Sequence, residues 1–153
     1  MERMRSMSIQ FHYLCRGIIL DNRKVLLAHQ IGATHTFLPG GHIDLGEGAE
    51  AALVREILEE TGKAATIEVF IGAVEAGWRE AGTDHHEINL LFRTTLAGVD
   101  PRVPVKSLEK HIEFMWSDVN DLQKNNLLPK AMVQCISGLP ERSFAFWGSE
   151  FRA

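Results

Sequence analysis

The sequence predicts an α/β fold, an α/β/α sandwich in which a mixed sheet lies between helices. Three observations predict it: strand-like segments lie on both sides of an amphipathic helix, a second helical segment follows them, and no repeat or linker divides the chain. At 153 residues, with 45% hydrophobic and 24% charged residues, the chain has the size and composition of one globular domain. We therefore expect a single domain over residues 1–153.

The first segment is typical of strands and a glycine turn. Residues 9–20 are rich in β-branched and aromatic side chains, which predicts a strand. Asp21 to Lys24 is polar and predicts a turn, so residues 25–29 are expected to return as the second strand of a hairpin. Pro39-Gly40-Gly41 then interrupts the strand pattern, and glycine there lets the backbone approach a ligand closely.

A helix is predicted from Ala49 to Thr61, with Gly62 ending it at a position where glycine takes the left-handed conformation. Its pattern is amphipathic, because apolar and acidic residues fall on opposite arcs. The arc expected to face the core consists of Leu53, Val54, Ile57, Leu58 and Thr61.

The segments after the helix complete the predicted order of elements. Apolar runs and alternation predict strands, prolines predict a loop, and the aromatic tail is apolar enough to pack back on the domain. In chain order, they are a strand at 65–77, a polar connection from Arg79 to His86, a strand at 87–96, a loop at 98–111, a strand from Ile112 to Trp116, a helix from Pro129 to Ile136 and the tail at 139–153.

Charge and cysteine content exclude several classes of protein. The net charge of −4 and the pI near 6.0 argue against an extended nucleic-acid partner, which normally requires a basic surface. A small anionic substrate stays open if a metal ion neutralises it. Cys15 and Cys135 lie in apolar stretches and are expected to be buried free thiols. No membrane span or secretion signal is recognisable, so we expect a cytoplasmic protein.

Three glutamates form the most informative cluster. Glu56, Glu59 and Glu60 fall on one helix face at positions i, i+3 and i+4, with the small Ala49 and Ala52 upstream, which we expect to leave room above the carboxylates. A solvated acidic face is the alternative interpretation. The preceding glycine turn favours a metal site instead, because it offers bare carbonyl oxygens beside carboxylates, the hard ligands that Mg²⁺ or Mn²⁺ prefer.

The segment from Gly41 to Lys63 resembles the Nudix box, a long pattern of fixed glycine, glutamate and arginine positions. Lys63 is the one departure, since the family has an apolar residue there, and Ala64 can take over its packing. The matching residues are Gly41, Glu47, Arg55, Glu56, Ile57, Glu59, Glu60 and Gly62. The resemblance implies the Nudix fold and a Mg²⁺-dependent hydrolase, with Mn²⁺ as the alternative ion.

The resemblance also implies roles for single residues. The metal ligands would be the Gly40 carbonyl, Glu56 and Glu60, with Glu59 ligating as well or bridging through water. Arg55 and Glu47 would orient the glutamates through a salt bridge and hydrogen bonds. Arg55, Glu56 and Glu59 are therefore the box residues expected to act in catalysis.

A further glutamate from outside the box is expected to complete the site. Members of the family commonly recruit one after the box, and a metal ligand is poorly suited to act as a free base. We favour Glu109, in the loop before the strand at Ile112, over Glu113 in that strand. The alternative is that both residues are solvated surface charges. In that case Glu56 or Glu59 is the base.

The expected reaction is hydrolysis of the diphosphate linkage of a nucleoside diphosphate derivative, such as a nucleoside triphosphate or a nucleotide sugar. The partner is then a small nucleotide-like substrate, and a homodimer stays open. One alternative is a Nudix-fold module that binds nucleotide or regulates without catalysis. A structural cation-binding protein is a weaker alternative, because no EF-hand loop is present.

The substrate itself is poorly defined by the sequence. Nudix enzymes for ADP-ribose often carry a proline after the box, and this chain has none between Pro39 and Pro101. The signature of coenzyme A hydrolases is also absent upstream of the box. His85 and His86 either contact phosphate or are loop residues without a role in binding. A zinc site is not expected, because no third ligand is suitably spaced. Four aromatic residues could either stack on a base or pack in the core: Phe37, Trp78, Trp116 and Trp147.

Overall fold

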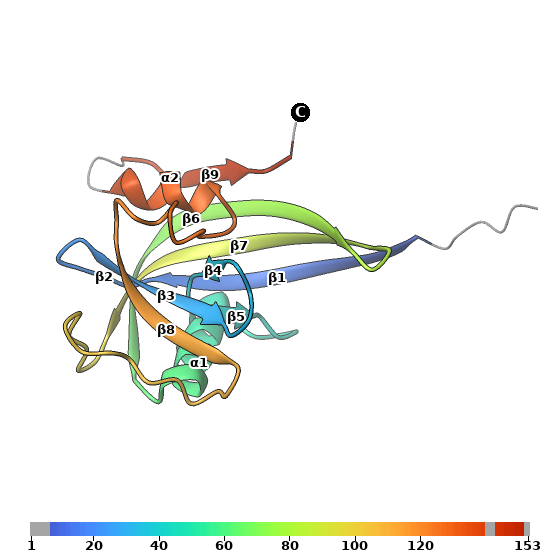
Figure 1. Ribbon diagram of the computed structural model, residues 1–153. Coiled ribbons are helices and arrows are strands. Elements are labelled where there is room, and N and C mark those ends of the chain that lie inside the picture. Colours follow the sequence, from blue (N-terminus) through green and yellow to red (C-terminus); the bar gives the residue numbers. More distant parts are fainter. Residues whose placement is uncertain (1–6, 140–142, 152–153) are drawn as a thin grey trace, which may run out of the picture.

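The computed structural model describes residues 7–139 and 143–151, and within them two sheets lie between two helices (Figure 1). The larger sheet has five strands, in the spatial order β5 (Gly40–His42), β1 (Ser8–Ile18), β7 (Thr83–Leu96), β6 (Ala65–Glu80) and β9 (Phe146–Ser149). The smaller sheet consists of β2 (Leu20–Asp21), β3 (Lys24–Gln30), β4 (Thr36–Phe37) and β8 (Ile112–Asp118). The helices are α1 (Ala49–Thr61) and α2 (Ala131–Ser137).

The larger sheet is mixed, which confirms the predicted fold class. Strand β1 pairs parallel with β7 and antiparallel with β5, and β6 pairs antiparallel with β7 and parallel with β9. Helix α1 covers one side of the molecule, and α2 with β9 covers the opposite side (Figure 1). The site described below lies where β1, β5 and α1 meet, because α1 packs on both of these strands.

The predicted hairpin between residues 9–20 and 25–29 is wrong for most of its length. Only β2 and the end of the first segment pair with β3, through Leu20 opposite Val25 and the Ile19 carbonyl, which accepts from the Leu26 N–H at 3.0 Å. The rest of the first segment, β1, is a central strand of the other sheet. Burial explains this, because Cys15 faces the core under α1 and Ile18 faces the other core, so both sides of β1 need cover.

Helix α1 has the predicted bounds. Gly62 ends it in the left-handed conformation, with φ 69°, and its N–H donates to the Leu58 carbonyl. Leu53 and Ile57 are fully buried, whereas Leu58 is half exposed, so the expected core arc is narrower than the sequence suggested. The helix therefore presents its glutamates close to the edge of the core.

Two clusters of buried apolar residues hold the layers together. One lies between α1 and the larger sheet, and the other lies between the two sheets and α2. The first consists of Cys15, Ile19, Leu26, Ala52, Leu53, Ile57, Phe92, Leu96 and Val105. The second consists of Ile18, Val25, Leu27, Leu38, Val74, Leu91, Leu122, Leu127, Met132, Cys135 and Ile136. Both cysteines are buried, as predicted, and they form no disulfide with each other.

Strands β6 and β7 form one long hairpin, and the predicted polar connection from Arg79 to His86 is mostly strand. The turn is confined to Ala81 and Gly82, both with positive φ, and pairing begins again at Glu80 opposite Thr83. Cross-strand pairing satisfies the backbone there even though the side chains are polar. Together with the first half of β1, the hairpin projects beyond both helices as an arm (Figure 1).

The C-terminal segment packs back on the domain, as predicted, by adding β9 to the edge of β6. The approach is close at Gly72, where a side chain would collide with the Phe146 backbone. Phe146 packs on the core, whereas Phe144 is 85% exposed and Trp147 59% exposed. The predicted tail also includes residues 140–142 and 152–153, which lie outside the described residues.

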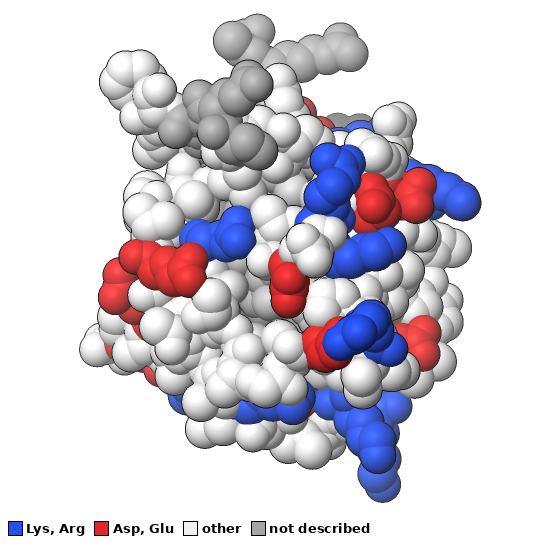
Figure 2. Space-filling model, turned by 90° about the vertical axis from the view of Figure 1, so that its left-hand side faces the viewer, with Lys and Arg blue, Asp and Glu red and all other residues white. Residues whose placement is uncertain are grey.

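Charge is distributed without a dominant sign on the face shown in Figure 2. Acidic and basic side chains are interspersed there, and neither forms a continuous stripe. This pattern agrees with a small net charge of −4. Within the described residues, no helix is long and apolar enough to cross a membrane.

Candidate active site

Two adjacent glycines in β5 bring the backbone against the acidic helix. Gly40 has φ 136°, and a side chain at this position would collide with the Cys15 carbonyl of β1. A Cβ at Gly41 would lie 2.5 Å from the Glu56 carboxyl carbon. The glycines are therefore required so that β5 can lie between β1 and the Glu56 side chain.

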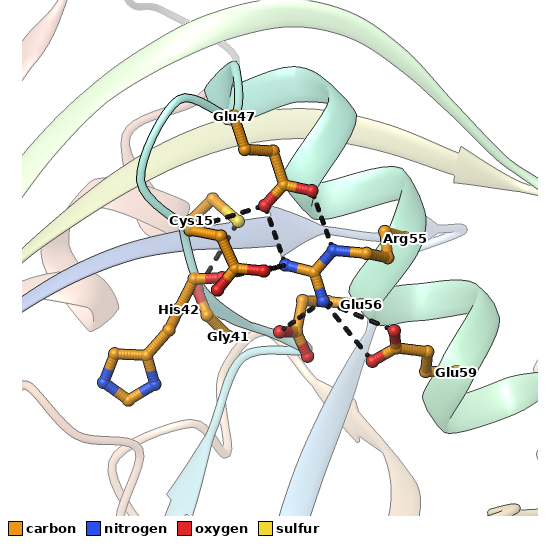
Figure 3. A network of polar contacts seen from close by, with 8 residues as sticks. Cys15, Gly41, His42, Glu47, Arg55, Glu56 and Glu59 are labelled. Atoms are coloured by element: carbon orange, nitrogen blue, oxygen red, sulfur yellow. Dashed lines mark hydrogen bonds and ion pairs between the residues drawn. The ribbon is translucent and has the colours of Figure 1, made fainter.

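Arg55 connects β5 and the loop between β5 and α1 to the acidic face, which is formed by Glu56, Glu59 and Glu60 (Figure 3). Its Nε and one terminal nitrogen donate to the two Glu47 oxygens at 2.7 and 2.8 Å, a two-donor contact. The other terminal nitrogen donates to Glu56 at 3.1 Å and to both Glu59 oxygens at 3.4 Å. Arg55 also donates to the His42 carbonyl at 3.1 Å, so one guanidinium fixes the loop and two of the three glutamates.

The hydrogen bonds from Arg55 set the ionisation of Glu47. They lower the pKa of this carboxyl to about 2, and Glu47 in turn raises the pKa of Arg55. Both groups therefore stay charged at neutral pH. Their contact is an orientation device that does not switch with pH.

Glu60 is the most unusual side chain of the helix. It is only 6% exposed, and its Oε2 has no hydrogen-bond partner. Burial raises the pKa of Glu60 to about 8, and the nearby Glu56 and Glu109 add to this effect, while Arg16 and the Gly40 backbone oppose it. An unpaired carboxylate oxygen in such a place is unfavourable unless a cation joins it.

The acidic face is thus graded in exposure rather than uniformly solvated. The Glu59 side chain is 53% exposed and the Glu56 side chain 18% exposed, next to the buried Glu60. The expectation that Ala49 and Ala52 leave room above the carboxylates is wrong. Ala52 is fully buried in the core and Ala49 packs on the same cluster, because the helix turns this side toward the sheet.

The residues present fit a hydrated magnesium ion. In the parts of the chain that the structure describes, no three acidic, histidine or cysteine side chains converge as a closed metal cage. Mg²⁺ does not need such a cage, because it usually binds one or two carboxylates and keeps several waters. The buried free oxygen of Glu60 and the neighbouring Glu56 supply carboxylates of this kind.

The structure brings Glu109 to the acidic face and leaves Glu113 elsewhere. The loop before β8 is held to the end of α1 by a hydrogen bond from the Leu108 N–H to the Glu60 carbonyl at 2.8 Å. Glu109 follows directly, raises the pKa of Glu60 and lies 3.4 Å from His111. Glu113, in contrast, pairs with His29 of β3 at 2.8 Å.

A cleft of about 790 Å³ is connected to the acidic face through Arg16, which lines it and interacts with Glu60 and Glu56. Arg16 of β1 lies in its wall and donates to the Asn89 side chain at 3.3 Å and to the Leu38 carbonyl at 3.1 Å. Its guanidinium also lies 5.4 Å from the centre of the Phe37 ring. The cleft is lined by Arg16, Gln30, His35, Phe37, Ala76, Gly77, Trp78, Arg79, Glu80, Glu87, Asn89, Leu128, Pro129, Lys130 and Glu150.

Arg16 links the cleft to the acidic face, and sequence reasoning missed it. Burial lowers the pKa of Arg16, while Glu87, Glu60 and Glu56 oppose this effect, so the side chain lies among carboxylates of both regions. One signal was available in the sequence, because a charged residue inside an otherwise apolar strand pattern is a candidate functional residue.

Three histidines lie in a row next to Trp78, which lines the cleft, and two of them come from strands other than that of His85. His12 lies 3.0 Å from His42 and 2.9 Å from His85, and Trp78 stacks on His85 with the ring centres 4.8 Å apart. The two neighbours contact opposite ring nitrogens of His12. The three imidazoles therefore do not converge on one point, as a zinc ion would require.

Comparison with known proteins agrees with this geometry. The family model described as NUDIX domain matches residues 12–135, most of the chain. The chain belongs to the Nudix family. Its Nudix box is the segment Gly41–Lys63. This segment contains Gly41, which lies against the Glu56 carboxyl group, and Arg55 with the glutamates that it binds.

Similar Nudix-related proteins include two curated relatives and a solved structure. A putative 8-oxo-dGTP diphosphatase of Bacillus subtilis (strain 168) is 41% identical over 58 residues, 38% of this chain and 39% of that protein. An ADP-ribose pyrophosphatase of Methanocaldococcus jannaschii is 31% identical over 113 residues, 71% of this chain and 62% of that protein. The chain thus matches less than two thirds of either relative. A NUDIX hydrolase structure from Nitrosomonas europaea is 24% identical, with TM-score 0.62 over 86% of this chain and 89% of that one.

The first prediction is that Glu60→Gln stabilises the metal-free protein. Because folding raises the pKa of Glu60 from 4.5 to about 8, the folded state holds a proton that the unfolded chain has lost, and stability falls as pH rises through this window. Glutamine removes that loss. In EDTA at pH 8, calorimetry should show a Tm higher by at least about 3 °C, the effect of ~1 kcal/mol in a domain of this size, and a smaller gain at pH 5.

A Glu60→Gln variant that melts below the unmodified protein at pH 8 contradicts this prediction. It would mean that the carboxylate supports the fold.

The second prediction concerns Arg55 and metal affinity. Arg55→Ala should weaken Mn²⁺ or Mg²⁺ binding about 10- to 100-fold, the usual effect of losing a residue that orients ligands. Arg55→Lys should restore only part of the affinity, because an ammonium group cannot keep the two-donor contact with Glu47. Isothermal titration calorimetry measures both. Arg102→Ala is the matched control, since Arg102 makes a similar contact with Asp100 on an exposed loop. Full rescue by lysine would remove the orientation argument.

Proposed function

We propose that the chain is a Mg²⁺-dependent Nudix hydrolase that cleaves a phosphoric anhydride bond of a nucleotide derivative. One observation supports this above the others. Glu60 buries a carboxylate oxygen without a partner beside Glu56 and a glycine backbone, which is costly for the fold alone. A cation bound there compensates this cost, and the adjacent cleft has the volume of a nucleotide-sized ligand.

In this proposal, Glu56, Glu60 and the Gly40 carbonyl hold the metal, with Glu59 as a further or water-bridged ligand. When bound, Mg²⁺ neutralises diphosphate charge and lowers the pKa of a coordinated water. Arg55 keeps Glu56 and Glu59 in place through the contacts described above. Gly41 keeps Glu56 close to the backbone, since any side chain there would displace the carboxylate.

Glu109 is the proposed general base. It lies near Glu60 but belongs to the loop before β8 rather than to the helix, so it can accept a proton without leaving a ligand position. Its contact with His111 is on the surface and does not bury it. Arg16 is proposed to bind a phosphate oxygen, because it lies between the cleft and the acidic face.

The proposed substrate is a nucleoside diphosphate derivative whose nucleoside occupies the cleft. Phe37 and Trp78 line the cleft and offer apolar faces, and Glu87 and Asn89 add polar groups to its lining. The relatives are named for 8-oxo-dGTP and ADP-ribose, which both contain a diphosphate linkage. A nucleoside triphosphate and a sugar derivative both meet these requirements. A cytoplasmic location is proposed on the sequence alone.

A Nudix-fold module that binds nucleotide without cleaving it is the second candidate. It would retain the cleft but would have no use for a buried, unpaired carboxylate. The presence of Glu56, Glu59 and Glu60 together with Arg55 supports the enzyme over this module.

The third prediction tests the enzyme directly. With Mg²⁺ and not with EDTA, water should cleave the phosphoric anhydride bond of at least one member of a panel. Nucleoside triphosphates, including 8-oxo-dGTP, would release phosphate or diphosphate, whereas ADP-ribose and nucleotide sugars would give a nucleoside monophosphate and a sugar phosphate. Glu56→Gln should lower kcat by at least about 100-fold. Glu50→Gln, an exposed position in the first turn of the same helix, is the control and should keep full activity. Nucleotide binding without turnover on the whole panel would favour the binding module.

The fourth prediction separates Glu109 from Glu113. Glu109→Gln should lower kcat about 10²- to 10⁴-fold and remove the acidic limb of the pH–rate profile, because a base must be deprotonated to act. Its Mg²⁺ affinity should change little. Glu113→Gln should leave kcat unchanged, since Glu113 pairs with His29 away from the site. If both variants keep kcat, the base is not Glu109, and Glu56 or Glu59 takes that role.

A further inference from the structure

The first half of β1 forms an open edge of the larger sheet. On its outer side, β1 pairs with β5 only from Leu14 to Arg16, and the last contact on this side is the Ile43 N–H donating to the Tyr13 carbonyl at 3.0 Å. Among the described residues, no strand or loop makes a backbone hydrogen bond to the outer side of β1 before Tyr13. This edge lies on the projecting arm (Figure 1).

The register identifies which backbone groups point outward. Tyr13 and Gly17 bond to the β5 side, through the Tyr13 carbonyl and through the Gly17 N–H to the Pro39 carbonyl. Because backbone direction alternates along a strand, Phe11 and Ile9 also present their N–H and C=O groups to the open side, and Met7 does so if the strand is extended by one residue. These groups match what an added strand pairs with.

The same residues present an apolar stripe on one face. Met7, Ile9 and Phe11 are 65, 71 and 63% exposed. From Met7 to Phe11 the chain contains no charge, no proline and no bulge, the features that normally protect an edge strand. The edge therefore has no charge to repel an identical segment and nothing in its side chains to block pairing.

We propose that two copies of the chain pair through this edge, antiparallel, about a two-fold axis at Ile9. Ile9 then lies opposite Ile9 of the second copy, and Phe11 lies opposite Met7 of the second copy. Each of these pairs exchanges both backbone hydrogen bonds, since the residues that point outward are the ones that meet. The two apolar stripes join on one face of a continuous sheet, and Ser8 and Gln10 lie on the other.

The two-fold axis lies at Ile9 because β5 and Ile43 already occupy the edge of β1 from Tyr13 onward. An axis at Phe11 would place Ile9 of the second copy opposite Tyr13, where Ile43 already lies. An axis at Ile9 keeps the second strand within the open part of the edge. The same patch meets itself, as a two-fold interface requires.

Sedimentation velocity on the full chain tests the proposal. A strand pair buries less than a standard interface, so we expect a reversible dimer with Kd about 1–100 µM. Ile9→Glu places two carboxylates opposite each other and should raise Kd at least about tenfold. Val69→Glu is the matched control, an exposed apolar residue of β6 outside the arm, and should leave Kd unchanged. Melting curves should show both variants folded.

Cysteine cross-linking tests the register. With the thiol oxidant diamide, Ile9→Cys should give a covalent dimer, because the antiparallel register brings the two Cα atoms to about 5.5 Å. Phe11→Cys should not, because it faces Met7 of the second copy. A monomer up to about 500 µM, a dimer that Ile9→Glu leaves intact, or cross-linking through Phe11→Cys alone would each overturn the proposal.

Discussion

The guanidinium of Arg55 is the constraint on which the acidic face depends. It holds Glu47 before the helix, Glu56 and Glu59 within it and the His42 carbonyl of β5, so one group joins loop, helix and strand. Glutamates at this spacing repel one another unless a cation lies between them. Lysine has three donors on a flexible stem and no fixed fork, which explains why an arginine suits this position.

A second constraint acts from the sheet side. Glu60 is buried from the helix and Arg16 is buried from β1, and each lowers the electrostatic cost of the other. The two charges compensate each other only in part, because Arg16 donates its hydrogen bonds to Asn89 and the Leu38 carbonyl. The fold thus tolerates an unpaired carboxylate oxygen where we propose that a metal ligand is required, at some expense of stability, as functional sites often do.

How much could be predicted follows from the range of the interactions. Helix α1 and its three glutamates depend on contacts three and four residues apart, and the sequence predicts their bounds and their common face correctly. The partner of β1 depends on long-range pairing, and adjacency wrongly favours a hairpin with β3. For the same reason the sequence does not reveal that Arg16 enters the cleft or that His12 meets both His42 and His85, since these neighbours come from separate strands. Periodicity also does not show that Ala52 is fully buried, because its small side chain fits either arc of the helix pattern.

The parallel pairing of β1 with β7 has a consequence for how the protein folds. Ser8 lies beside Thr83, so the sheet closes a long loop of chain that includes the whole acidic helix. Loop closure of this kind is slow compared with helix formation. We therefore expect the helix with its clustered glutamates to form transiently before the strands that bury Glu60 are joined. In that order of events, the cost of burying the carboxylate arises late in folding, and we expect it to accelerate unfolding while leaving the rate of folding nearly unchanged.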